Sequence, residues 1–85
     1  MPTPSHERAL LVLLQPIIQG HQSGQAVSMG ESGGVVIERR GHVRGIWRCM
    51  TETFAWTPAG YNEPTYHAAD LDHAVRYTQT VVLAA

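Results

Sequence analysis

Residues 35–57 read VVIERRGHVRGIWRCMTETFAWT, and this stretch decides the fold. It opens with β-branched residues in alternation, so Val35 and Ile37 fall on one face of a strand. Gly41 then accepts the positive φ that a tight turn requires, and the alternation resumes after it. The pattern predicts a strand, a turn and a return strand, which together form an antiparallel hairpin.

The sheet is predicted to extend beyond this hairpin. The return strand is expected at about 43–50 and a further strand at about 54–57, before a turn built on Pro58 and Gly60. Residues 25–29 are a candidate edge strand. We therefore expect a three-stranded antiparallel sheet, or a four-stranded one if residues 25–29 join it.

A helix is predicted before the sheet. Residues 1–4 contain two prolines and are expected to form a tail, after which Ser5 is a candidate N-cap. The first helix is then expected over 6–19, with a kink or restart at Pro16, because proline lacks the N–H of the helical hydrogen bond.

A second helix is predicted after the sheet. Asp70 is a candidate N-cap, and the apolar residues that follow it within 70–83 fall on one helical face. Eighty-five residues leave room for one core only. The chain is therefore predicted to be a single α+β domain over 1–85, with two layers and a helix at each end of the sequence.

The first helix carries more apolar side chains than one small sheet can cover, because consecutive residues point 100° apart. The stripe expected to face the sheet comprises Leu10, Leu13, Leu14 and Ile17. Leu11, Val12 and Ile18 remain outside that stripe and are the candidate interface residues. The leading functional hypothesis is therefore a non-enzymatic binding or assembly module that forms a homodimer or docks on a protein partner.

Composition indicates whether the chain folds and in which compartment it is expected. A hydrophobic content of 44% with 15% charged residues predicts a folded chain, and a net charge of −1 gives no overall attraction to nucleic acid or to an anionic membrane. The single cysteine favours a reducing compartment. The apolar run at 9–14 is shorter than a signal peptide or a membrane span requires. A soluble, cytoplasmic protein without a membrane partner is expected.

Four of the six basic residues gather around the predicted hairpin, and all six are arginine. These four are Arg39, Arg40, Arg44 and Arg48. These arginines could bind phosphate groups, with the Trp47 indole stacking on a base. The order helix–three strands–helix also resembles that of double-stranded-RNA-binding domains. Those domains begin their last helix with lysines, whereas this chain has two aspartates, at 70 and 72. Nucleic-acid binding is therefore the third-ranked alternative and is not the expected function.

The second-ranked alternative is a small-ligand or effector site at the loop 61–67, near the sheet. Its candidate residues are Arg44, Arg48, Trp56, Tyr61, Glu63, Tyr66 and His67. The five histidines lack the spacing of a metal site, and no nucleophile motif is present, so no metal, cofactor or enzymatic activity is expected.

Overall fold

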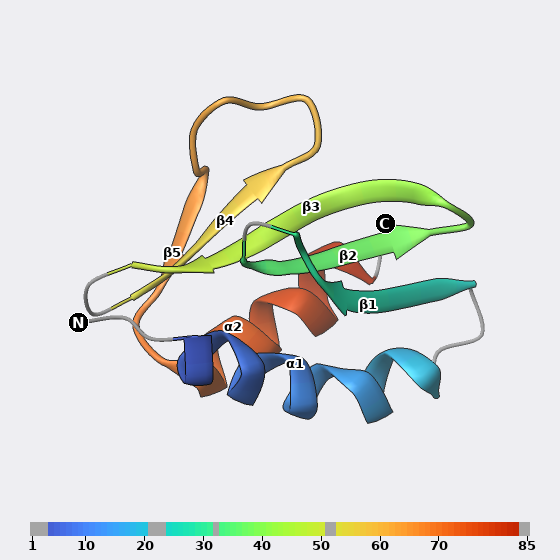
Figure 1. Cartoon of the computed structure of the whole chain (residues 1–85), viewed down its shortest axis with the longest axis horizontal. Coiled ribbons are helices and arrows are strands. Elements are labelled where there is room, and N and C mark those ends of the chain that lie inside the picture. The colour runs from blue at the N-terminus through green and yellow to red at the C-terminus, as the bar shows by residue number, and fades with distance from the viewer. Residues whose placement is uncertain (1–3, 21–23, 32, 51–52, 84–85) are drawn as a thin grey trace.

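The computed structural model describes residues 4–20, 24–31, 33–50 and 53–83 of the chain (Figure 1). Helix α1 spans Pro4–Gln19 and helix α2 spans Leu71–Tyr77, which continues into a π-helical turn, η1, at Thr78–Val82. Five strands lie between the helices: β1 (Gln25–Met29), β2 (Val35–Arg39), β3 (His42–Cys49), β4 (Phe54–Pro58) and β5 (Tyr66–Ala68).

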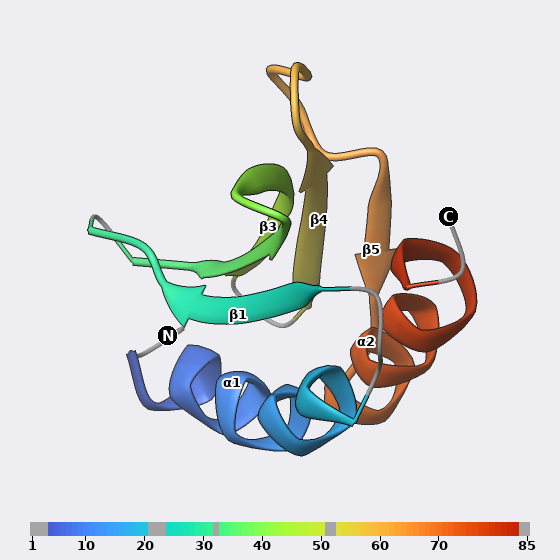
Figure 2. The ribbon, with the colours of Figure 1, turned by 90° about the vertical axis from the view of Figure 1, so that its right-hand side faces the viewer.

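The five strands form one antiparallel sheet in the order β1-β2-β3-β4-β5, so each strand pairs with its sequence neighbours. Both helices lie on the same side of this sheet (Figures 1 and 2). The predicted two-layer α+β fold is therefore confirmed. The sheet has one strand more than the largest number predicted. The additional strand, β5, begins at the end of the 61–67 segment, which was expected to be an irregular or briefly extended loop.

The β2–β3 hairpin turns over two residues, Arg40 and Gly41, between the paired residues Arg39 and His42. Both turn residues have positive φ, 53° at Arg40 and 83° at Gly41. This is the type I′ pattern, whose twist matches that of the flanking strands. The sequence predicted the glycine, but it did not predict that an arginine would occupy the left-handed region beside it.

Replacing Arg40 with asparagine is expected to stabilise the fold by about 0.5–1 kcal/mol, because asparagine tolerates the left-handed region and Asn-Gly is the favoured type I′ pair. The bond from the Arg40 N–H to the Gly24 carbonyl, at 3.0 Å, does not depend on the side chain. Arg40→Ala keeps the unfavourable φ and should change stability by less than about 0.5 kcal/mol. Urea unfolding of the three proteins would measure the difference. Equal stability of the asparagine and alanine variants would contradict the expectation.

A β-bulge interrupts the same hairpin. Ile37 pairs with Gly45, whereas its neighbour Glu38 pairs with Val43, so the register skips Arg44. A bulge leaves one residue unpaired and re-aims its side chain. Arg44 consequently does not follow the simple alternation that the sequence predicted for this strand.

One face of α1 is packed into the core; it includes Leu10 and Leu14, as predicted, but it is rotated away from Leu13 and toward Ile18. Leu10, Leu14 and Ile18 are all at most 1% exposed, whereas Leu13 is 45% exposed. The assignment of Leu13 to the core was therefore wrong, and Ile18 is a core residue that cannot serve an interface.

Glu7 provides the physical reason, because it fixes the rotation of α1 against the sheet. Its Oε1 accepts a hydrogen bond from the Gly34 N–H at 2.9 Å, and its Oε2 accepts one from the Cys49 N–H at 3.0 Å. Leu14 and Ile18 lie on the same helical side as Glu7, since each is separated from it by whole turns to within roughly 20°. Satisfying both N–H groups therefore turns that side of the helix toward the sheet and moves Leu13 outward.

Trp47 occupies the centre of the core and is fully buried. Its ring centroid lies 5.3 Å from that of Trp56, 6.3 Å from that of Tyr66 and 5.8 Å from that of Tyr77. Tyr66 and Tyr77 stack on each other at 3.9 Å. These aromatic contacts join β3, β4, β5 and α2, so they hold the C-terminal helix on the sheet.

The C-terminal helix carries side-chain hydrogen bonds at its start and at the point where it changes to a π-helix. Asp70 is the predicted N-cap, and its carboxylate accepts from the His73 N–H at 2.9 Å. This bond, followed by the one to the His73 ring, lowers the pKa of Asp70. Near the other end, Thr78 Oγ1 donates to the Ala74 carbonyl and accepts from the Trp47 indole N–H, where the chain changes from α- to π-helix.

Candidate functional site

The outward side of α1 presents an uncharged apolar stripe. Its members are Ala9, Val12, Leu13 and Pro16, which we call the α1 stripe. The spacing of three and four residues places them on one helical side. Val12 is 58% exposed and Leu13 is 45% exposed, so the centre of the stripe is open.

The predicted interface residues are distributed unevenly on α1. Val12 lies in the α1 stripe, as expected from the sequence. Leu11 is partly buried and packs against the core, and Ile18 is inside it. Leu13 belongs to the exposed surface instead, and it was missed because the helical wheel alone does not show how Glu7 sets the rotation of the helix.

Strand β1 lies above α1 at one edge of the sheet (Figure 2). It contains neither proline nor a charged residue, although such residues commonly protect edge strands from pairing with another chain. Beside the α1 stripe, β1 therefore offers a second uncharged element on the same part of the molecule.

The predicted ligand residues do not form one site. Arg48 and His67 are both paired with Ala55, so they share the sheet face opposite Trp47, where both are exposed. Tyr66 is held in the aromatic core by its stacking on Tyr77. The remaining candidates divide between two hollows.

One hollow, of about 200 Å³, lies where β3 and β4 meet the C-terminal turn; we call it the Arg44 hollow. Its lining residues are Arg44, Trp56, Pro58, Tyr77, Val81 and Val82. Arg44 and Trp56 are both among the predicted ligand residues, and both line this hollow. The sequence did not indicate the residues from α2 and η1, because their approach depends on how the helix docks on the sheet.

A second hollow, of about 420 Å³, lies in the loop between β4 and β5 and includes Tyr61 and Glu63. Its five lining residues, Tyr61, Asn62, Glu63, Pro64 and Thr65, are all exposed. Neither Arg44 nor Arg48 lines it, so the expected contact between this loop and an arginine is not present. The loop hollow therefore lacks the cation that its predicted anion-binding role required.

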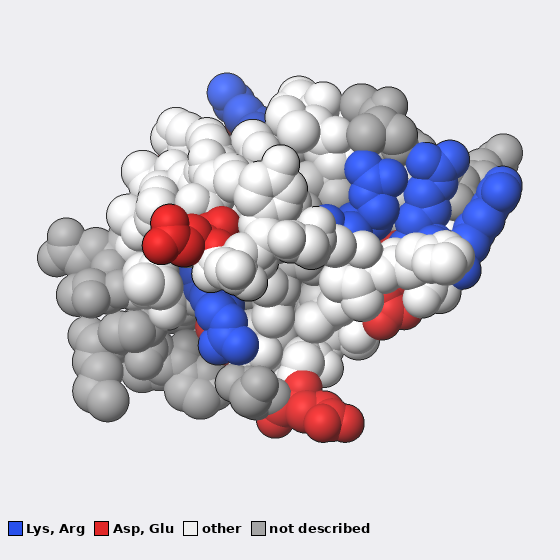
Figure 3. Space-filling view, turned by 90° about the horizontal axis from the view of Figure 1, so that it is seen from above, with Lys and Arg blue, Asp and Glu red and all other residues white. Residues whose placement is uncertain are grey.

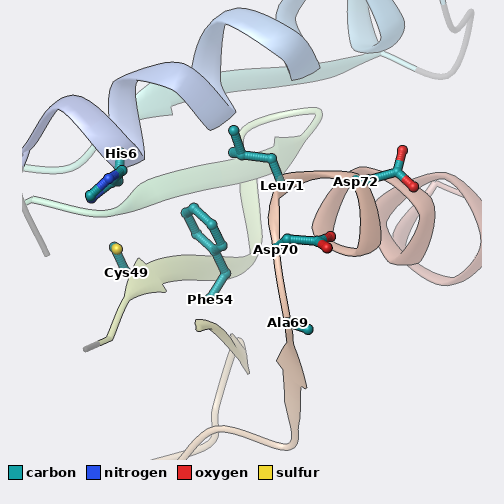
Figure 4. A pocket seen from close by; sticks show the side chains of 7 residues that line it. All are labelled: His6, Cys49, Phe54, Ala69, Asp70, Leu71 and Asp72. Atoms are coloured by element: carbon teal, nitrogen blue, oxygen red, sulfur yellow. The ribbon is translucent and has the colours of Figure 1, made fainter. Parts of the chain in front are cut away.

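A third hollow, of about 600 Å³, lies between the start of α1, the ends of β3 and β4, and the start of α2. Figure 4 shows His6 and Cys49 on one side and Asp70 on the other, with Phe54 and Leu71 between them. Sequence reasoning did not indicate this hollow, because its walls come from three segments that are far apart in the chain.

The cysteine and the aspartate that line this third hollow have defined surroundings. Burial, followed by the negative charge of Glu7, raises the pKa of the Cys49 thiol, which therefore stays neutral. The Asp70 carboxylate is engaged with His73 at the helix cap. In the described segments, no group of three His, Cys, Asp or Glu side chains is arranged to hold a metal ion.

Arginine side chains gather over the end of the sheet where the β2–β3 hairpin turns (Figure 3). Arg39, Arg40 and Arg44 come from this hairpin, and Glu38 lies on β2 within it. The observed order of helix, five strands and helix also differs from the helix–three strands–helix order of double-stranded-RNA-binding domains. The resemblance in element order therefore does not extend to the folded chain.

No protein-family model matches the chain, and comparison with curated proteins and with solved structures gives no significant match. No helix in the described part of the chain is both long enough and apolar enough to cross a membrane. Fold and surface together define an α+β domain in which two helices cover one side of a five-stranded meander. Its candidate functional features are the α1 stripe and the Arg44 hollow.

Proposed function

We propose that the protein is a non-enzymatic assembly module that pairs with a second copy of itself through the α1 stripe. The observation that supports this is the exposure of Val12 and Leu13, 58% and 45%, on a helix whose other side is buried. Apolar area left in water costs roughly 25 cal/mol per Å², and covering it on association recovers that free energy.

A second copy suits this surface because the α1 stripe is self-complementary. In an antiparallel helix pair about a twofold axis, each residue meets a partner at a mirrored position along the stripe. With the axis between Val12 and Leu13, Val12 of one copy lies against Leu13 of the other, and Ala9 lies against Pro16. The stripe carries no charge, so this arrangement places no like charges within the contact.

The stripe is short, and its small area implies a weak or transient dimer. The uncharged edge of β1 could enlarge the contact by strand pairing, because it lies beside α1 (Figure 2). Helix contact and strand pairing therefore make different predictions about which variants dissociate the dimer.

Glutamate at position 13 is expected to abolish the self-association, because it places a charge at the centre of the proposed interface, next to the twofold axis. Sedimentation equilibrium or light scattering up to about 1 mM would measure it; an association worth roughly 4 kcal/mol is half-maximal at that concentration. We expect the wild-type average mass to rise toward twice the monomer value, and Leu13→Glu to remain at the monomer value with unchanged circular dichroism.

Val43→Glu is the matched control, because Val43 is 48% exposed and lies on β3 rather than on α1. It introduces the same charge at similar exposure and should leave the dimer intact. Ala26→Lys tests the β1 edge and should weaken association only if strand pairing contributes. A wild-type protein that remains monomeric at about 1 mM, or equal effects of Leu13→Glu and Val43→Glu, would contradict the proposal.

A further inference from the structure

We infer that the Arg44 hollow is a binding site for a small organic carboxylate, with Arg44 contacting the carboxylate and the aromatic floor contacting the rest of the molecule. This inference is independent of the proposed assembly, because the hollow is formed by β3, β4, α2 and η1, and no residue of α1 lines it.

The surroundings of the Arg44 guanidinium favour the binding of an anion. It is partly buried, and its guanidinium forms no ion pair or hydrogen bond with a side chain in the described segments. Two ion pairs of those segments lie in α2 and at its cap, between Asp70 and His73 and between Asp72 and Arg76. A partly buried guanidinium without a carboxylate partner gains from binding a carboxylate through two parallel hydrogen bonds.

The β-bulge explains how the Arg44 side chain comes to line the hollow. The bulge opposite Ile37 and Glu38 leaves Arg44 unpaired in the β2–β3 register, and Arg44 lines a hollow together with residues from the helix side of the sheet. In a regular strand, Gly45 would share the face of Trp47 and Arg44 would point to the opposite face of the sheet. Bulges commonly re-aim side chains at binding sites, and this one places a cation beside an aromatic surface.

The floor of the hollow is rigid and apolar. Trp56 is 4% exposed and Val82 is 3% exposed, so both are fixed by the core, and Tyr77 is held by its stack with Tyr66. Gly45 allows the Trp56 ring to lie against the strand, because a Cβ there would come within 2.5 Å of that ring. A rigid apolar floor with one polar contact at its side is the usual composition of a small-ligand site.

Size and charge select the class of ligand. The volume of about 200 Å³ equals roughly seven water molecules in the liquid, which suits a ring-sized group and is too small for a nucleotide. Arg44 is the sole charged residue among the described lining residues, so a single negative charge is matched and a doubly charged phosphate is not. The expected ligand is therefore a monocarboxylate that carries a flat apolar group.

Benzoate is the probe for this site, and benzamide, which has nearly the same shape without the charge, is its neutral counterpart. We expect benzoate to shift the Trp56 indole N–H and the Val81 and Val82 amide signals in ¹H–¹⁵N NMR spectra, with millimolar affinity. Arg44→Gln should weaken benzoate binding at least tenfold and leave benzamide binding unchanged. Arg48→Gln, which removes an arginine from the opposite face of the sheet, should leave benzoate binding unchanged.

Several results would overturn the inference. They are the absence of saturable shifts at Trp56 and Val82, equal binding of benzoate and benzamide, and equal losses in the two arginine variants. Tighter binding of inorganic phosphate than of benzoate would show that the hollow selects charge rather than a carboxylate with an apolar group. Because Leu13→Glu should not alter benzoate binding, failure of the carboxylate site and failure of self-association can be told apart.

Discussion

Alanine in place of Trp47 is expected to lower the free energy of unfolding by about 3–5 kcal/mol, the range for deletion of a buried tryptophan side chain. Trp47 is fully buried and contacts the rings of Trp56, Tyr66 and Tyr77. Its removal would leave a cavity between the sheet and α2. A domain of 85 residues has on the order of 4–13 kcal/mol of stability in total, so the variant should be close to unfolding at room temperature.

The hydrogen-bonding part of this effect can be measured separately at Thr78. Thr78→Val keeps the shape but removes the hydroxyl that accepts from the Trp47 indole at 3.0 Å, and should cost about 1–3 kcal/mol. Thr78→Ser retains the hydroxyl and should keep the hydrogen-bond contribution. Urea unfolding monitored by tryptophan fluorescence would compare the variants. A Trp47→Ala protein that loses less than about 1 kcal/mol would show that the aromatic cluster is not the centre of the core.

The second large effect is expected at Gly34, where alanine should destabilise the fold by about 2–5 kcal/mol, combining backbone strain with overpacking. Gly34 has a φ of 86°. A Cβ at this position would lie 2.6 Å from Ile46 Cδ1 and 3.1 Å from the Trp47 carbonyl oxygen. The same residue donates its N–H to Glu7, so a shift of the backbone would also disturb the bond that orients α1.

Gly60 provides the matched control for this prediction. Its φ is 87°, almost identical to that of Gly34, but a Cβ at Gly60 would meet no atom within 4 Å. Gly60→Ala should therefore show the backbone cost alone, about 1–2 kcal/mol. The difference between the two variants in urea unfolding measures the packing contribution at Gly34. Equal destabilisation would mean that Ile46 moves aside freely, contrary to the expected overpacking.

The aromatic core stabilises the fold and also supports the floor of the Arg44 hollow. Trp47 contacts Trp56 and Tyr77, and these two residues form part of the floor of the hollow. Thr78→Ser should leave benzoate binding intact, because it preserves the hydroxyl that fixes Trp47 against the helix. The hollow thus depends on the docking of α2 and η1, which no local pattern in the sequence describes.

Local rules in the sequence determined the elements whose formation needs few distant contacts. Alternation of β-branched residues predicted the strand at 35–39 with its observed bounds, and Asp70 capped the second helix as expected. Gly41 marked the hairpin turn. In each case, one residue type or a short period satisfies a backbone requirement in place, so the outcome does not depend on the rest of the chain.

Tertiary structure decided which surfaces those elements present. The apolar residues of α1 could face the sheet in more than one rotation, and the two bonds of Glu7 to Gly34 and Cys49 selected the one that exposes Leu13 and buries Ile18. Likewise, only the bulge in β3 and the docking of the C-terminal turn bring Arg44 beside Tyr77 and Val82. Periodicity gives the faces of an element, but long-range hydrogen bonds and packing set the direction in which those faces point.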